Sequence, residues 1–485
     1  MKFKHFYKIV FFLIATSFLV SCSNKGDDEV PELTVSIKNI SFEPEGGTSD
    51  EVTINVNSAW TISNSASSWL QLSKSSGADG TTTFTFTASE NVTNYSRTVT
   101  LTVEADNGQA RRITITQDGN LYPSYNLFPK PADATGMSTA VELAAKFKMG
   151  WNIGNTFEAP GGETGWGSPV ITEGYVKAIK QLGFSAIRIP CAWNLHLDNE
   201  ATAHIDQNWI KRVKEVVGYC VNNDIYVMLN IHWDGGWLEN NITKAKQEAV
   251  NAKQRALWQQ IATEMRDFDE HLMFASANEP NADDAEEVAV LASYHQTFVK
   301  AVRSTGGKNS HRVLIVQGPN TNPKLTFDLM NTLPTDPTPN RLMVEVHNYT
   351  PSQFCFGSKD ESWGKMIYYW GNGHHSTIEP DRNATYGEED EIIADYNMMK
   401  TKYIDKGIPV ILGEYGAYRR NNSANVPKDL ETHEASVDYW ISFTTKEALD
   451  RGIKPFWWDI GAAVDRQNFN VKDQRTIDAI MKGLE

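Results

Sequence analysis

Cysteine is scarce in this chain: its 485 residues include only four, and no two of them are closely spaced. That scarcity excludes a disulfide-stapled scaffold and a thiolate zinc site. A surplus of positive charge is also missing, because 60 Asp and Glu outnumber 45 Lys and Arg and give a formal net charge of −15. An acidic chain is a poor partner for nucleic acid or anionic lipid, so we exclude nucleic-acid binding. The apolar run at residues 9–20 is too short to cross a bilayer comfortably.

The amino-terminal residues 1–21 are expected to be a targeting signal rather than part of a fold. Three lysines precede the apolar run, and Cys22 follows it. This arrangement resembles a bacterial lipoprotein signal, which implies removal of residues 1–21 and lipidation of Cys22. The alternative is a simple secretory peptide with an incidental cysteine. The acidic linker 22–32 resembles the export signal of Bacteroides-type surface lipoproteins, which implies a lipid-anchored protein of the cell outer membrane that faces outside.

Residues 33–119 alternate apolar and polar side chains in short runs rich in Thr and Val. The runs at 52–56 and 98–103 are examples, and glycine-containing turns separate such runs. This pattern predicts a small immunoglobulin-like all-β sandwich. The sequence around Trp60 and Trp69, with the closing segment 115–119, resembles a BACON domain. Either these tryptophans bind sugar or they are core or edge residues of a spacer, and we favour the spacer.

The chain changes character after residue 119. Residues 120–135 contain three prolines and predict a stiff linker. From 136 to 485, apolar strands alternate with longer amphipathic segments, which predicts a (β/α)8 TIM barrel. The expected strands are 147–152, 184–190, 226–232, 271–278, 313–318, 342–347, 410–414 and 454–459, and the expected helices include 208–221, 244–267, 285–303 and 433–449.

Polar residues gather where these expected strands end. Two ends carry a glutamate, in Asn278-Glu279-Pro280 and in Gly413-Glu414, and four others deliver arginine, histidine, tyrosine or tryptophan. Each alone has a structural explanation, but six of eight strands sending such residues to one rim is hard to reconcile with chance. Hydrolysis of a glycosidic bond needs two carboxyls, one protonated and one ionised.

This constellation, in this order along the chain, resembles glycoside hydrolase family 5. The resemblance covers about residues 136–485 and implies Glu279 as acid/base and Glu414 as nucleophile. It also implies supporting and substrate-binding residues. These are Arg188, which keeps the nucleophile ionised, Asn278, which binds the sugar 2-hydroxyl, His232, His347 and Tyr349, which line the reacting subsite, and Trp458 or Trp457 as its floor, of which we choose Trp458.

The two carboxyls must differ in protonation for the reaction to proceed. Glutamate has a solution pKa near 4.3, so we expect the neighbours of Glu279, Glu414 among them, to raise its pKa. Retention of anomeric configuration predicts a separation of about 5 Å between the carboxyls. Neither a metal nor another cofactor is needed.

The sequences of the first and last expected strands of the barrel indicate which class of glycan is cleaved. The segments 151–157 and 456–459 resemble subfamily 4, which implies an endo-β-1,4-glucanase for plant cell-wall glucans. The context of a surface lipoprotein favours xyloglucan as the substrate, and we expect a monomer. Mixed-linkage glucan, cellulose, mannan and xylan remain alternatives, as does a non-catalytic glycan-binding protein. Stacking subsites could come from aromatic residues in the long loop 350–395 and elsewhere, namely Phe354, Phe356, Trp363, Tyr368, Tyr369, Trp370, Trp166, Trp193 and Trp237.

Overall fold

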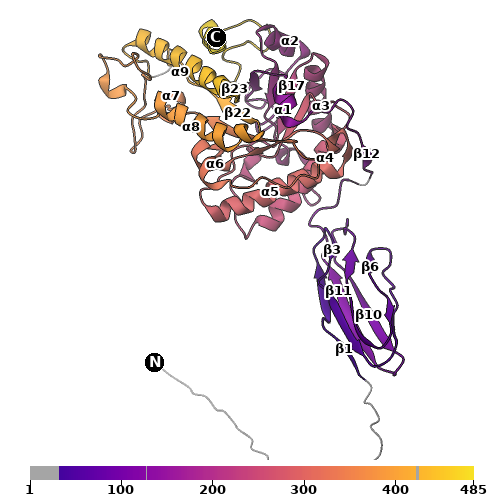
Figure 1. Ribbon diagram of the computed structural model, residues 1–485. Coiled ribbons are helices and arrows are strands. Elements are labelled where there is room, and N and C mark those ends of the chain that lie inside the picture. The colour runs from indigo at the N-terminus through magenta and orange to yellow at the C-terminus, as the bar shows by residue number, and fades with distance from the viewer. Residues whose placement is uncertain (1–31, 127, 422–424) are drawn as a thin grey trace, which may run out of the picture. The chain divides into compact units, whose positions relative to one another are not determined.

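The computed structural model describes residues 32–126, 128–421 and 425–485. The chain forms two compact units (Figure 1). The described part of the first unit consists of residues 32–91 and Ser96–Asp118, and the second consists of Val92–Tyr95 and Gly119–Glu485. The predicted signal and Cys22 lie outside the described residues. Across the described part of the chain, no helix is both long enough and apolar enough to cross a membrane.

The first unit is the predicted all-β sandwich. Its sheets are ordered β1-β4-β8, β2-β11-β10-β5-β7 and β3-β9-β6. The strands are β1 Leu33–Val35, β2 Asn39–Phe42, β3 Gly47–Thr48, β4 Val52–Val56, β5 Trp60–Ile62, β6 Leu70–Leu72, β7 Ser76–Gly77, β8 Gly80–Phe84, β9 Phe86–Ala88, β10 Arg97–Ala105 and β11 Ala110–Gln117.

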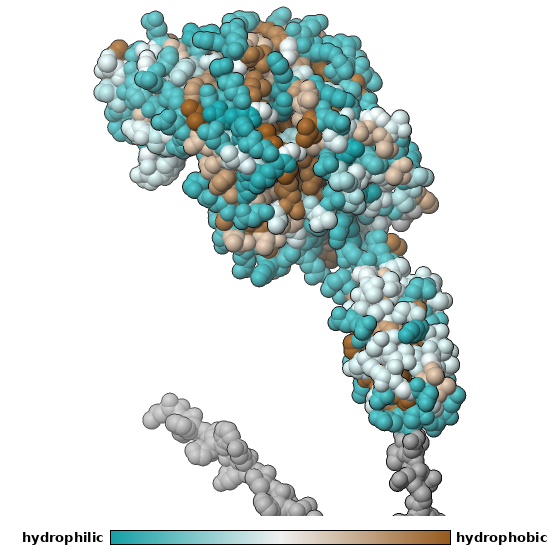
Figure 2. Space-filling view, in the orientation of Figure 1, coloured by the Kyte–Doolittle hydropathy of each residue, from teal (hydrophilic) through white to brown (hydrophobic). Residues whose placement is uncertain are grey.

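Alternation along β10 and β11 explains why the two faces of this hairpin differ. Leu101, Val103, Ile113 and Ile115 point into the core and are fully buried. The intervening threonines line the other face, where hydroxyls of opposite residues pair across the strands. In Figure 2 the visible face of this unit is mostly pale, with few brown residues.

The two tryptophans of the sandwich are not open sugar platforms. Trp60 is only 1% exposed and packs against Gly77, where a Cβ atom would lie 2.6 Å from its Nε1. Trp69 is partly buried, and the guanidinium of Arg97 lies 4.5 Å from the centre of its ring. Trp60 is therefore a core residue, and one face of Trp69 is covered.

The described residues of the segment predicted as a linker, 120–126 and 128–135, dock on the barrel unit. The backbone N–H of Tyr125 donates to Gln259, and Asn126 donates to the carbonyl of Ser304. The short strand β12 Lys130–Ala132 pairs with β19 Gly306–Gly307. The barrel surface supplies the partners that hold this segment.

The second unit is the predicted TIM barrel, with helices around a closed ring of parallel strands (Figure 1). The ring is β13 Gly150–Ile153, β14 Ala186–Ile189, β17 Tyr226–Asn230, β18 Leu272–Ala275, β20 Leu314–Gln317, β21 Leu342–Asn348, β22 Val410–Tyr415 and β23 Lys454–Asp459. A second small sheet pairs β15 Leu197–Asn199 with β16 His204–Ile205.

The helices are α1 Ala140–Ala144, α2 Glu173–Gln181, α3 Gln207–Asn222, α4 Gln247–Glu264, α5 Ala285–Ser304, α6 Pro323–Leu329, α7 Ser352–Cys355, α8 Glu389–Lys402, α9 Leu430–Asp450 and α10 Gln474–Lys482. Short 3-10 turns occur at Asn194–His196, Asp234–Gly236, Lys308–Ser310, Pro319–Thr321, Pro380–Arg382 and Ile404–Lys406. Side chains of Asp206, Asp284 and Asp473 accept backbone N–H groups at the starts of α3, α5 and α10, which explains where these helices begin.

Two cores hold the barrel together. Large apolar residues on the outward faces of the strands pack under the helices. Inside the ring, Met228, Met273, Met343 and Phe456 form a smaller cluster with Phe147, which follows α1. Because this apolar cluster fills the inside of the ring, the polar side chains lie at the carboxyl ends of the strands.

Candidate active site

The polar residues predicted at the strand ends meet at the carboxyl-terminal rim of the barrel. Arg188 extends from β14, Asn278 and Glu279 follow β18, and β21 and β22 carry His347 and Glu414. Hydrogen bonds and ion pairs connect all five side chains. The fold thus brings together residues that are far apart in the sequence.

Arg188 is the central cation of this site and is completely buried. Its Nη1 donates to Glu414 Oε1 at 2.7 Å and to Asn152 Oδ1 at 3.0 Å. Its Nη2 donates to Asn278 Oδ1 at 2.7 Å. Because the guanidinium group is planar and rigid, these bonds fix Glu414 and Asn278 relative to each other.

Glu414 is aimed into the barrel by a bulge in its strand. Val346 pairs with Leu412 but His347 pairs with Glu414, so Gly413 is an extra residue in β22. The Tyr349 hydroxyl donates to Glu414 Oε2 at 3.0 Å, while Arg188 contacts the other oxygen. Both carboxylate oxygens are therefore held by donors.

The two glutamates lie close together. One atom able to ligate a metal, a carboxylate oxygen or a ring nitrogen, comes from each of Glu279, His347 and Glu414, and these three atoms lie within 4.8 Å of one another. Such a set could hold a metal ion, although hydrolysis by two carboxyls requires none. The short separation fits retaining glycosidases, whose carboxyls lie about 5–5.5 Å apart, rather than inverting ones at about 6.5–9.5 Å.

Glu279 is paired with a charged histidine. His347 Nδ1 lies 2.7 Å from Glu279 Oε1, and His347 Nε2 lies 3.2 Å from Glu345 Oε1. Burial lowers the pKa of His347, but Glu414, Glu279 and Glu345 outweigh it and raise that pKa to about 9.

The pKa of Glu279 differs from the expectation that its neighbours would raise it. Burial does raise it, but the hydrogen bond and charge of His347 prevail, so the net pKa is below the usual value. The proton shared by this pair therefore rests on the imidazole.

His232 and Trp458 form another part of the rim. Their rings are nearly parallel, with centroids 5.8 Å apart. Burial and the charge of Arg188 lower the pKa of His232 to about 3, so its imidazole is neutral. Trp458 is partly exposed, whereas Trp457 is 5% exposed and packs on Tyr415. The structure thus places Trp458, rather than Trp457, beside the reacting groups.

The aromatic residues considered for stacking divide by exposure. Trp166, Phe356 and Trp363 are at least half exposed. Phe356 is also near the chemistry, because its ring lies edge-on against Tyr349 at 5.3 Å. Trp193, Phe354, Tyr368, Tyr369 and Trp370 are buried and cannot present a ring face. Trp237 is partly buried and packs against the core.

Three buried polar residues of the site were missed by sequence reasoning: Asn152, Gln317 and Glu345. Asn152 contacts Arg188, and Glu345 contacts both Arg188 and His347. Alternation could have revealed Glu345, since it precedes His347 by two residues on a predicted strand and so faces the same way.

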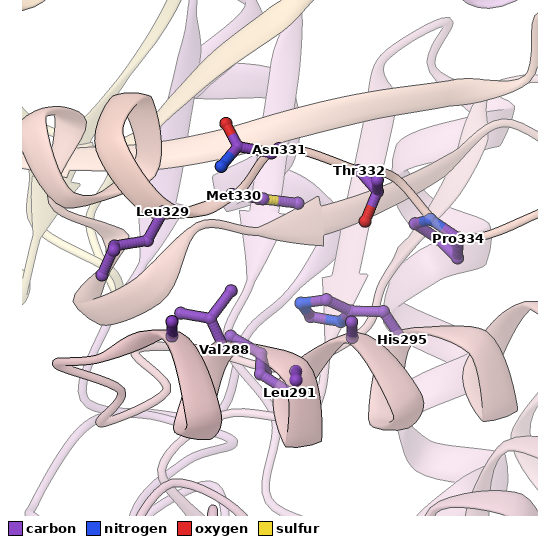
Figure 3. Close-up of a pocket in the computed structure, with 11 residues that line it drawn as sticks. Val288, Leu291, His295, Leu329, Met330, Asn331, Thr332 and Pro334 are labelled. Carbon is purple, nitrogen blue, oxygen red and sulfur yellow. The ribbon is translucent and has the colours of Figure 1, made fainter.

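A separate cavity of about 160 Å³ lies between α5 and the segment that follows α6 (Figure 3). Val288, Leu291 and His295 line one side. Both ring nitrogens of His295 are occupied, by Ser276 and by the carbonyl of Gln317. None of the strand-end residues described above lines this cavity.

Comparisons with known proteins agree with this architecture. The sequence model of the cellulase family, glycosyl hydrolase family 5, matches residues 152–464, and that of the BACON family matches 58–118. A xyloglucan-specific endo-β-1,4-glucanase of Bacteroides ovatus is 34% identical over 501 residues, which span 98% of this chain and 96% of that protein.

Solved structures give the same result. A Bacteroides ovatus GH5 xyloglucanase in complex with a heptasaccharide is similar with a TM-score of 0.69 and 32% identity, over 94% of this chain and 100% of that one. A GH5 xyloglucan-specific β-1,4-glucanase from a ruminal metagenomic library has a TM-score of 0.66 and 38% identity, over 72% of this chain and 96% of that one.

A parallel eight-stranded barrel with two close carboxyls at its rim defines a glycoside hydrolase of the barrel class. The chain belongs to glycoside hydrolase family 5, whose members retain anomeric configuration, and it carries a BACON domain before the barrel.

Proposed function

We propose that this enzyme is an endo-β-1,4-glucanase that cleaves the backbone of xyloglucan, with Glu414 as nucleophile and Glu279 as acid/base. The observation that carries the proposal is the pair of carboxyls within 4.8 Å, one held by Arg188 and Tyr349 and the other by His347. The substrate-binding roles are proposed from the family resemblance: Asn278 binds the 2-hydroxyl, and His232, His347, Tyr349 and Trp458 lie around the reacting sugar.

In the first step, the Glu414 carboxylate attacks the anomeric carbon and the bond to the leaving glucosyl oxygen breaks. Glu279 gives its proton to that oxygen, so the products are a glycosyl ester on Glu414 and a free chain end. In the second step, the Glu279 carboxylate takes a proton from water while the water oxygen attacks the same carbon. The ester bond breaks, Glu414 returns to its carboxylate form, and the configuration is retained.

The proton for the first step is supplied by the His347–Glu279 pair. The two groups share one proton across a 2.7 Å hydrogen bond. A shift of that proton to Glu279 leaves a neutral imidazole, and burial favours the neutral form of both groups. Exclusion of water by a bound glucan chain would therefore favour the acid form of Glu279.

Xyloglucan is proposed as the main substrate because relatives named above are described as xyloglucan-specific β-1,4-glucanases or as a xyloglucanase. Exposed rings at Trp166, Phe356 and Trp363 are available to stack on sugars along a chain. An endo-acting enzyme needs such contacts on either side of the cleaved bond.

For location, we propose that Cys22 is lipidated and anchors a monomeric enzyme on the outside of the outer membrane, with the sandwich as a spacer. Glucan would then be cut where it first meets the cell. Radiolabelled palmitate should be incorporated into the full chain and not into Cys22→Ala. Equal labelling of both chains would overturn the anchor and leave the enzymatic proposal intact.

The enzymatic proposal is tested by reducing-sugar release from xyloglucan, mixed-linkage β-glucan, carboxymethyl cellulose, xylan and glucomannan, with Glu414→Ala in parallel. Fast release from xyloglucan that disappears in the variant is the expected result. A strong preference for an unbranched glucan would overturn the choice of substrate. Binding without release from any of the five would favour a glycan-binding protein instead.

A further inference from the structure

Glu345 is a carboxyl group buried inside the barrel with no exposure to solvent. It lies on β21 and faces the two cations of the active site. Its Oε1 is 3.2 Å from Arg188 Nε and 3.2 Å from His347 Nε2. Its Oε2 accepts a hydrogen bond from Gln317 Nε2. Burial raises the pKa of Glu345, but Arg188, His347 and Gln317 outweigh it and hold that pKa below its usual value, so the group is ionised.

The backbone of the neighbouring strand is shaped to admit this carboxylate. A Cβ atom at Gly413 would lie 1.9 Å from Glu345 Oε1. Gly413 is also the extra residue of the bulge that aims Glu414 into the site. The glycine before the nucleophile is therefore required by Glu345, and any larger residue there would displace either the carboxylate or the strand.

The two cations that Glu345 holds are the ones that contact the two reacting carboxyls. Arg188 contacts Glu414, and His347 contacts Glu279. We propose that Glu345 is a positioning residue for the reaction, because one buried negative charge holds Arg188 against the nucleophile and His347 against the acid/base. The inference rests on the roles of Glu279 and Glu414 given under the proposed function, and extends them to a residue that touches neither substrate nor reacting atom.

Charge balance supports this role. Glu279 and His347 share one proton and are neutral as a pair, so Arg188, Glu414 and Glu345 leave the site with one excess negative charge. That negative charge helps the pair to keep its proton. Without the charge of Glu345 the excess disappears, the pair loses its proton more easily, and that loss removes the acid needed for the first step.

The charged and titratable groups around Glu345 come from several strands of the barrel. Arg188 of β14 and His347 of β21 contact Glu345 directly, and the charge of Glu345 acts on Glu279, which follows β18. Glu414, which carries the Tyr349 hydrogen bond, and the neutral His232 are linked to it through Arg188 and His347. Removing one negative charge from this set favours the deprotonated form of each titrating neighbour. Both limbs of the pH profile of kcat/KM should therefore move toward acid pH.

The substitution Glu345→Gln removes the charge and keeps the shape. Glu239→Gln is its matched control, because Glu239 is equally buried near Glu279, yet no salt bridge joins it to a cation within the described residues. Burial raises the pKa of Glu239 well above its usual value, so that carboxyl is neutral and its amide analogue removes no charge. Glu345→Asp keeps the charge but shortens the side chain.

The experiment measures kcat and KM against pH for the full chain and these three variants, with melting temperature as a check on folding. For Glu345→Gln we expect kcat to fall about 10- to 100-fold, KM to change little, and the pH profile to move acid by about one unit. Glu239→Gln should keep the wild-type profile. A Glu345→Gln variant with wild-type kcat and an unshifted profile overturns the inference.

Two further measurements keep the result decisive. If Glu345→Gln does not fold, Glu345→Asp must retain the wild-type pH profile with a reduced kcat, and a shifted profile in that variant counts against the inference. The 15N chemical shifts of His347, assigned by its substitution, report its charge without any substrate. If the wild-type chain releases sugar from no glucan, the proposed function has failed, whereas a His347 imidazolium that is lost at lower pH in Glu345→Gln still supports the charge role.

Discussion

The imidazole of His347 and the carboxyl of Glu279 are joined by a 2.7 Å hydrogen bond at the rim of the barrel. This relationship assigns the resting proton to the histidine, whose pKa is raised to about 9 by Glu414, Glu279 and Glu345 despite its burial. The acid of the reaction is thus a pair of residues, and its strength depends on every charge that touches either member.

The acid/base role of Glu279 predicts a dependence on the leaving group. Glu279→Ala should lower kcat on a glucan by about 10²- to 10⁴-fold, because a sugar alkoxide is a poor leaving group unless it is protonated as the bond breaks. On a dinitrophenyl glycoside, which leaves without protonation, the first step should be nearly unaffected. Pre-steady-state release of dinitrophenol measures that step, and an equal loss on both substrates would show that Glu279 is not the acid.

Arg188 cannot be replaced by lysine without loss. Its guanidinium donates to Glu414, Asn152 and Asn278 from a completely buried position, and a single ammonium group cannot reach all three acceptors. We expect Arg188→Lys to fold with a reduced melting temperature and to lose about 100-fold or more in kcat. Wild-type kinetics in Arg188→Lys would contradict the assignment of Arg188 as the support of the nucleophile.

The adjacent tryptophans of β23 should behave differently. Trp457 is buried against Tyr415, so Trp457→Ala should cost about 3–5 kcal/mol of stability. Trp458 is partly exposed beside His232, so Trp458→Ala should lower kcat/KM more than stability. Chemical denaturation and kinetics on both variants measure this contrast, and the reverse pattern would assign the subsite floor to Trp457.

Phe356 is expected to contact substrate next to the reacting sugar. It is 50% exposed and lies edge-on against Tyr349, and Arg420 holds its loop by donating to the carbonyls of Gln353, Phe354 and Gly357. Loss of one stacking ring costs about 1 kcal/mol, so Phe356→Ala should raise KM several-fold and Phe356→Tyr should not. Phe327→Ala on α6 is the control for an exposed ring away from the site, and a KM equal to that of the control would refute the contact.

The pH dependence of stability follows from His347. Its pKa is about 9 in the folded protein and near 6.5 when unfolded, so the folded state binds the extra proton between these values. This contribution, on the order of 3 kcal/mol, is complete below pH 6.5 and is lost as pH rises through 9. The stability difference between wild type and His347→Gln in urea denaturation should shrink over that window. A difference that stays constant or grows would mean that His347 is not charged when folded.

Much of this fold could be predicted because its strands have a clear sequence pattern. Runs such as 271–278 and 342–347 are apolar, short, and followed directly by polar residues, so both the barrel and the contents of its rim follow from one pattern. The sandwich was predicted for a related reason, since Thr and Val alternate along β10 and β11.

What could not be predicted depends on contacts between distant residues. The bulge at Gly413 is set by the carboxylate of Glu345 on another strand. The described part of the segment 120–135 docks because Gln259 and Ser304 offer partners to it. Trp370 and Phe356 lie on the same long loop with similar local sequence character, yet one is fully buried and the other half exposed. The direction of the Glu279 pKa shift likewise depends on the charge of His347, which Glu345 helps to maintain.

The central claim is that Glu414 forms a covalent bond with the sugar, while Glu279 first donates a proton to the leaving oxygen and then accepts one from water. It is tested most directly by treating the enzyme with a 2-deoxy-2-fluoro cello-oligosaccharide bearing a good leaving group, followed by mass spectrometry of the intact chain and of its peptides. The account predicts one adduct per chain, located on the peptide that contains Glu414, and full labelling in Glu279→Ala. An adduct on Glu279, or turnover of the reagent without any adduct, would contradict it.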